Sequence, residues 1–193
     1  MARIPVTEEP VDLKAVGNRI MKRVLFTIFI SGVITYLYYH YAPIKTRNFD
    51  SVGDKIAYVI QCNLLSVCFI MRVVHKIGDT RRKSNQVNPL SSKDLHKIDV
   101  AVRVLQNTLE QFVINIFLQL ISVTWFGSDE MKLIPICAFW FLLGRILFWI
   151  GYNDPSDSRT KRAYGFALTF FPSVVLAMFC IFMFFWDIYL AYF

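Results

Sequence analysis

Three polar residues in the middle of the chain have the types and the spacing to bind a small charged molecule. Arg103, Asn107 and Glu110 follow one another at intervals of four and three residues. In an α-helix this spacing puts all three side chains on one face. An arginine donates hydrogen bonds to carboxylates, and a glutamate beside an amide accepts them from an amine. The stripe therefore predicts a site for a small anionic or zwitterionic ligand.

Further polar residues are expected at the same end of the molecule. Arg145 lies seven residues before Tyr152, so these two share a helix face. Glu110 and Arg145 are expected at one depth, about 10 Å below the rim at ~1.5 Å per residue, where they would pair. Glutathione, with two carboxylates, one ammonium group and a thiol, matches the charge pattern of this end. The residues that we expect to converge there are Arg72, Lys76, Arg103, Asn107, Glu110, Arg145, Tyr152 and Arg162.

The same residues also allow interpretations that need no ligand. Cations at helix ends, such as Arg72 and Arg162, commonly extend toward the membrane surface. Glu110 and Arg145 would then form an ion pair between helices, and the Asn and Gln side chains would join helices by hydrogen bonds. Tyr152 would be one of the aromatic residues typical of a membrane interface. These interpretations stay open beside ligand binding.

Five membrane-spanning helices are predicted to hold these residues. The chain is 55% hydrophobic and only 18% charged, which is unlike an ordinary soluble domain and excludes a disordered chain. The apolar residues form five blocks, each near the ~20 residues that cross a bilayer as a helix. We expect spans at 24–42, 56–74, 133–152 and 164–193, the last with a kink at Pro172. A third span begins at a capping signal, Ser91 with Asp94, and ends near residue 126.

The first block is predicted to be a retained anchor, because its 19 residues exceed the ~7–15 of a signal-peptide core. The domain organisation is then a basic segment at 1–23, an extra transmembrane helix at 24–42 and a four-helix membrane domain at 55–193. The four cysteines lie inside apolar blocks and form no CxxC pair, so no metal site is predicted.

The Lys and Arg residues indicate an orientation in the membrane. With five spans, the N-terminus and the second and fourth loops share one side and carry fourteen of these residues, against four on the other side. Positive residues concentrate in the cytosol, so the N-terminus is predicted to be cytosolic. The net charge of +7 follows from this topology and needs no nucleic-acid partner.

The polar stripe and the motifs after it resemble the MAPEG superfamily, membrane-associated proteins in eicosanoid and glutathione metabolism. The likeness covers residue 56 to the C-terminus. It rests on Arg103-x-x-x-Asn107-x-x-Glu110, Gly144-Arg145, Gly151-Tyr152, Arg162 and Pro172. The resemblance implies an all-α integral membrane protein with a MAPEG-like four-helix bundle, here preceded by one extra N-terminal transmembrane helix. It also implies a homotrimer that binds glutathione between subunits near the cytosol.

The resemblance also implies roles for individual residues. The glutathione-binding residues would be Arg72, Arg103, Asn107, Glu110 and Arg145. The catalytic residues would be Arg162, as the group that stabilises the thiolate, and Tyr152, which assists it.

Two functions follow from these features. One is a glutathione-dependent enzyme that acts on a lipophilic electrophile or peroxide from the membrane lipid. The other is a non-catalytic membrane protein that regulates secretory-pathway or receptor traffic. Leu105 and Phe148, at positions often polar in the enzymes, favour the second. So does the extra helix, which resembles a divergent five-span member found in secretory-pathway membranes.

The sequence also indicates a location and disfavours one further class of protein. The expected location is the endoplasmic reticulum or another endomembrane, such as the Golgi or the lysosome. A channel is disfavoured, because the polar residues are expected to concentrate at one end of the bundle.

Overall fold

Helices make up all the regular structure of the described residues. The computed structural model describes residues 13–42, 48–83, 96–154 and 158–192. A 3-10 helix, η1 (Glu130–Lys132), precedes α5. The α-helices are α1 (Leu13–Tyr41), α2 (Val52–Cys62), α3 (Leu64–Lys83), α4 (His96–Ser122), α5 (Leu133–Asn153) and α6 (Ser158–Tyr192). The prediction of an all-α fold is confirmed.

Four helical segments are long and apolar enough to cross a membrane: Lys14–Tyr41, Val52–Lys83, Glu130–Asn153 and Thr160–Tyr192. The helix α4 is not among them, because its charged and amide side chains lower its hydropathy. It is nevertheless 27 residues long and packs against α3, α5 and α6. The protein is thus a multi-pass integral membrane protein, in which a four-helix bundle follows the extra helix α1.

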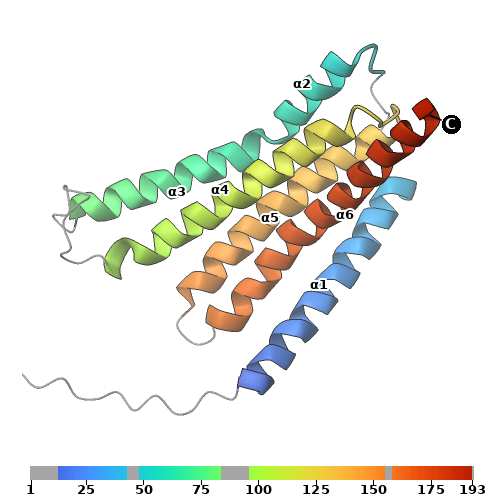
Figure 1. Cartoon of the computed structure of the whole chain (residues 1–193). Helices are drawn as coiled ribbons and strands as arrows, with labels where there is room; N and C mark the ends of the chain where they lie inside the picture. The colour runs from blue at the N-terminus through green and yellow to red at the C-terminus, as the bar shows by residue number, and fades with distance from the viewer. Residues whose placement is uncertain (1–12, 43–47, 84–95, 155–157, 193) are drawn as a thin grey trace, which may run out of the picture.

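The helices run up and down along one direction (Figure 1). The start of α1, the end of α3, the start of α4, the end of α5 and the start of α6 lie at one end of the molecule, and α2 and the end of α6 lie at the other. The helix α1 lies beside α6 and packs against α5 and α6. The first end contains the described part of the segments that are rich in Lys and Arg.

Several helix boundaries differ from the predicted ones. The helix α1 begins at Leu13 rather than at residue 24, and α6 begins at Ser158 rather than at residue 164, with Pro172 inside it. The helix α2 begins at Val52 because Ser51 and Asp54 form a capping box, with Asp54 N donating to Ser51 Oγ (3.2 Å) and Ser51 N to Asp54 Oδ2 (3.0 Å). The predicted cap at Ser91 and Asp94 lies outside the described residues, as does residue 193.

The predicted span at 56–74 lies within the membrane-spanning segment Val52–Lys83, which Asn63 divides into α2 and α3. The Asn63 side chain donates to Val59 O (2.9 Å) and to Gln119 Oε1 (2.9 Å). A short amide that bonds to nearby backbone competes with the regular helix pattern. The helices α2 and α3 therefore follow one another with a bend at Asn63, visible in Figure 1.

Glycines bring α5 and α6 into backbone contact. A Cβ atom on Gly144 would lie 2.6 Å from Thr169 Cγ2 and 2.8 Å from Gly165 O. A Cβ atom on Gly151 would lie 2.6 Å from Arg162 N. Small residues that let two backbones approach are a common means of association between membrane helices. The closely packed α5–α6 hairpin is the frame on which the polar residues are held.

Candidate functional site

The centre of the site is Arg145 of α5, which is fully buried (0% exposed). Its Nη1 donates to Asn107 Oδ1 of α4 (2.9 Å), and its Nη2 donates to Thr169 Oγ1 of α6. The guanidinium carbon also lies over the rings of Phe148 (4.7 Å) and Phe141 (5.8 Å). One arginine thus joins three helices, with polar atoms at its tip and aromatic faces beside it.

The predicted ion pair between Glu110 and Arg145 is wrong. Glu110 is exposed on the outer side of α4, where its Oε1 accepts a hydrogen bond from Gln106 Nε2 (3.1 Å). The spacing of the residues did not predict the direction in which Glu110 points. Arg145 takes Asn107 as its partner, because Asn107 faces inward from α4.

The other predicted ligand-binding cations also lie on the outer surface. Arg103 is exposed, and its Nε donates to Asp99 Oδ2 (2.8 Å), one turn earlier on α4. Arg72 of α3 is exposed as well. The fold therefore divides the predicted cluster into an inner part, Arg145 with Asn107, and an outer part, Arg72, Arg103 and Glu110.

The two residues predicted to be catalytic do meet. The Arg162 guanidinium carbon lies 4.9 Å from the centroid of the Tyr152 ring. Tyr152 also packs edge-on against Phe148, which in turn lies against Arg145. The contact depends on Gly151, because a side chain there would strike the backbone of Arg162. An aromatic face stabilises a nearby cation, so the pair holds a positive charge where α5 ends and α6 begins.

A buried chain of hydrogen bonds continues from Arg145 along the bundle. Asn63 of the α2–α3 junction donates to Gln119 of α4, and Gln119 donates to Asn115, one turn earlier. Asn115 Nδ2 then donates to Ser173 Oγ of α6 (3.2 Å), and Ser173 donates to Thr169 O (3.0 Å). This bears out the interpretation of the amides as links between helices.

This buried chain of hydrogen bonds contradicts the expectation that polar residues concentrate at one end of the bundle. Asn115 and Gln119 lie in the second half of α4, away from the end that holds Arg162. Sequence reasoning missed Asn63, Thr169 and Ser173. The four-residue spacing of Asn115 and Gln119 was the available signal that a polar face needs partners on other helices.

The polar atoms that are buried without a hydrogen-bond partner among the described residues include Asn63 Oδ1, Ser66 Oγ, Thr108 Oγ1, Gln111 Oε1 and Arg145 Nε. Unpaired buried polar groups are rare and costly. They extend the polar interior of the bundle beyond the chain of hydrogen bonds.

The positions expected to be polar in an enzyme belong to the apolar core. Leu105 packs against the cluster of Val73, Ile77, Val104 and Phe148, and Phe148 is itself a member of that cluster. Phe148 also covers the Arg145 guanidinium. Phe148 therefore presents an aromatic face to Arg145, and Leu105 belongs to the same apolar core.

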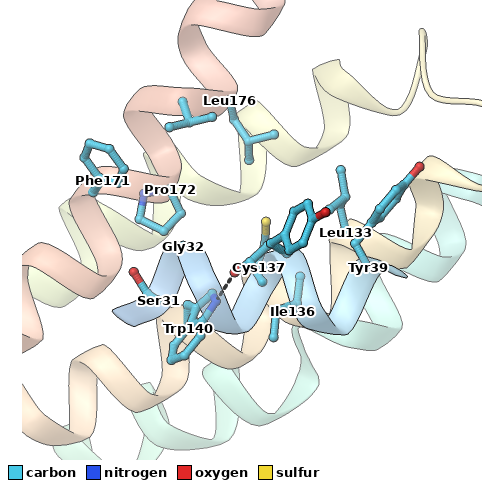
Figure 2. A pocket seen from close by; sticks show the side chains of 13 residues that line it. Ser31, Gly32, Tyr39, Leu133, Ile136, Cys137, Trp140, Phe171, Pro172 and Leu176 are labelled. Atoms are coloured by element: carbon cyan, nitrogen blue, oxygen red, sulfur yellow. Dashed lines mark hydrogen bonds between the residues drawn. The ribbon is translucent and has the colours of Figure 1, made fainter. Parts of the chain in front are cut away.

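Two hollows lie between α1 and the α5–α6 hairpin. One, of about 550 Å³, lies beside the first half of α1, and the other, of about 430 Å³, lies beside its second half. Figure 2 shows the second, where Trp140 points toward α1 and its Nε1 donates to Thr35 Oγ1 (2.8 Å). Neither hollow is lined by a residue predicted to bind a ligand or to be catalytic.

This combination of a polar α4, Gly144-Arg145 and Gly151-Tyr152 agrees with the sequence comparison. The sequence model of the MAPEG family matches residues 57–182, more than half of the chain. The chain therefore belongs to the MAPEG family, and the predicted resemblance is confirmed.

Among known proteins, the chain is similar to Transmembrane protein 79 from two mammals. The protein of Mus musculus is 18% identical over 177 residues, which cover 92% of this chain and 41% of the relative. The protein of Bos taurus is 19% identical over 160 residues, which cover 83% and 38%. The chain thus spans about two fifths of the length of these relatives. No solved structure matches it.

Proposed function

We propose that this MAPEG-family protein binds glutathione, or a similar small zwitterionic anion, on the outward face of α4. The observation that carries the proposal is the exposure of Arg103 and Glu110 on one face of that helix, with Glu110 near its middle. A charged side chain at the centre of a membrane helix costs at least ~2.5–3.5 kcal/mol, so Glu110 needs polar partners beyond the hydrogen bond from Gln106. A bound ligand and a second protomer would supply those partners.

The charges on this face match those of glutathione. Arg103 and Arg72 offer guanidinium groups to two carboxylates, and Glu110 accepts hydrogen bonds from an ammonium group. The helices α3 and α4 meet at Val73 and Val104, which belong to one buried cluster, so Arg72 and Arg103 lie on neighbouring turns. In this proposal Arg145 and Asn107 hold α4 in register beneath the ligand.

A more specific proposal is that the bound glutathione takes part in a reaction. Glutathione would supply the thiol that attacks a lipophilic electrophile or peroxide from the bilayer. The positive charge of Arg162, held over the ring of Tyr152, would lower the thiol pKa and favour the thiolate. A hollow of about 570 Å³, beside Phe69 and Trp149, would admit a lipophilic molecule between α3 and α5.

A non-catalytic role is the second candidate, and the packing of Leu105 and Phe148 favours it. Both positions belong to one apolar cluster, and Phe148 of that cluster covers the Arg145 guanidinium. In this alternative the protein regulates secretory-pathway or receptor traffic, with or without a bound anion.

Glutathione binding to the full-length protein in nanodiscs tests the proposal by calorimetry. Arg103→Leu and Glu110→Gln each remove a charge-assisted hydrogen bond, so each should weaken binding by roughly 10- to 100-fold. Arg82→Leu is the matched control, because it removes an exposed charge at the end of α3, and it should bind normally. Absence of saturable binding to the wild-type protein at millimolar glutathione contradicts the proposal.

The ultraviolet absorbance of the thiolate separates the enzyme from the non-catalytic protein. In the enzyme, Arg162→Leu should raise the pKa of the bound thiol and reduce the thiolate signal, while most of the binding remains. Binding without a thiolate signal in the wild-type protein supports the non-catalytic role.

We also propose a homotrimer in an endomembrane, with the N-terminus in the cytosol. The bias in Lys and Arg supports the orientation, and the exposed charges of α4 support coverage by a neighbouring protomer. A single cysteine at position 82, in a protein with the native cysteines replaced, should react with an impermeant maleimide only from the cytosolic side of sealed vesicles. Labelling only from the lumenal side would reverse the orientation.

A further inference from the structure

The helix α1 touches the bundle along a narrow line of small residues. Thr27 and Ser31 are buried against the α5–α6 hairpin, and Thr35 accepts the hydrogen bond from Trp140 (Figure 2). Both hydroxyls of the buried pair bond to the backbone of α1 itself, Thr27 to Arg23 O (2.8 Å) and Ser31 to Ile28 O (3.1 Å). Beyond this line the helices separate, which leaves the two hollows.

The larger hollow, which we call the α1 groove, has apolar walls along most of its length. Ile30 and Ile34 line it from α1, and Leu143 and Leu147 line it from α5. Its residues on α1 extend from Arg23 to Ile34, a rise of about 16 Å at ~1.5 Å per residue. This is close to half of the ~30 Å thickness of a bilayer core, so the groove has the depth of one leaflet.

The mouth of the α1 groove is positively charged. Arg23 lines it from α1, where it donates to Thr160 Oγ1 and lies over the Tyr164 ring (5.4 Å). Lys161 lines it from α6 and donates to Asp154. Arg19, four residues before Arg23, is exposed on the same face of α1. Arg23 and Lys161 thus bring two positive charges to the mouth, and Arg19 continues the basic face of α1 one turn earlier.

We propose that the α1 groove binds an anionic phospholipid from the leaflet on the N-terminal side. Its acyl chain lies between Ile34 and Leu147, and its phosphate and acidic headgroup lie beside Arg23. An apolar trough of one-leaflet depth with cations at its rim matches both parts of such a lipid. Its volume, about 550 Å³, lies within the ~300–1,000 Å³ of small-molecule sites. The site belongs to the extra helix and is independent of the face of α4.

Photo-crosslinking in nanodiscs tests the proposal with two probes, phosphatidylserine and phosphatidylcholine, each with a diazirine in the middle of an acyl chain. Peptide mass spectrometry should map the phosphatidylserine crosslinks to Ile30, Ile34, Leu143 and Leu147. Arg19→Gln should reduce this labelling by about fivefold and leave phosphatidylcholine labelling unchanged, since each basic residue contributes modestly at an anionic membrane surface.

A variant that fills the groove tests its apolar part. Leu147→Trp should abolish most of the phosphatidylserine labelling, and Val113→Trp, on the exposed face of α4, is the matched control that should not. Ile34→Trp fills the groove from the opposite wall and gives a second measurement if Leu147→Trp does not fold.

Four results would overturn the proposal. The first is equal labelling by the two phospholipids, and the second is labelling that neither tryptophan in the groove reduces. The third is displacement of the phospholipid by an equimolar free fatty acid. The fourth is a crosslink from the groove to a second copy of the chain, which would make that copy the occupant.

Discussion

The contact of α5 with α6 and the contact of α1 with both helices differ in kind, although all three are apolar membrane spans. Between α5 and α6, the glycines at 144, 151 and 165 bring backbone against backbone. In α1, a Cβ atom added to Gly17 or Gly32 would meet nothing within 4 Å. The first contact is closely packed, and the second leaves room for lipid.

The difference shows what holds helices together in a bilayer. Lipid tails solvate an apolar side chain as well as another helix does, so hydropathy alone gives no reason for two helices to meet. The α5–α6 contact adds close backbone packing and the hydrogen bonds of Arg145. The α1 contact has a stripe of small residues and two hydrogen bonds, from Trp140 to Thr35 and from Arg23 to Thr160.

The largest difference in stability between the two contacts is expected from a matched pair of glycine substitutions. In Gly165→Ala the new Cβ atom would overlap Phe148 N and Gly144 O, both backbone atoms that cannot rotate away. We expect a loss of ~3 kcal/mol or more, at or above the usual range of ~1–3 kcal/mol for overpacking. Gly32→Ala should leave stability unchanged or raise it slightly. Thermal unfolding in detergent measures both, and equal losses would abolish the distinction.

The next test concerns the hydrogen bond between Arg145 of α5 and Asn107 of α4. Asn107→Leu leaves a buried guanidinium with one partner fewer and should cost ~1.5–3 kcal/mol, the range for hydrogen bonds to charged groups. Arg145→Met removes the charge itself and should cost less, because well-packed apolar residues often replace buried charges without loss. The double variant should then be more stable than Asn107→Leu alone. Strictly additive losses in this cycle would show that the two residues do not interact.

The smallest effect is expected at the α1 contact. Trp140→Phe removes the hydrogen bond to Thr35, and such bonds between membrane helices average ~0.6 kcal/mol. The unfolding midpoint should barely change, but spin labels at positions 37 and 178 should report a broader range of α1–α6 distances. Trp125→Phe removes a bond to Asp187 at 2.7 Å and is the control that should leave this distribution unchanged. An unchanged distribution in Trp140→Phe would show that α1 does not depend on this bond.

Much of the fold was predictable because each span is encoded locally. The apolar blocks located the membrane segments, and the polar stripe with its glycine motifs indicated the family. The bend at Asn63 was not predicted, since its side chain bonds both to nearby backbone and to Gln119, and the second partner is far away in the chain. Only some of the predicted site residues lie together in the structure. Arg162 contacts Tyr152, and Arg145 contacts Asn107. Glu110 points away from Arg145.

The sequence by itself determined that this is a helical membrane protein of the MAPEG family and which residues share a helix face. It did so because hydropathy and helical periodicity are properties of consecutive residues. Only the tertiary structure decided which face of α4 points inward, that Thr169 and Asn107 partner Arg145, and that α1 is separated from the hairpin by grooves. These depend on the rotation and spacing of neighbouring helices, which side-chain volume and backbone approach determine in three dimensions.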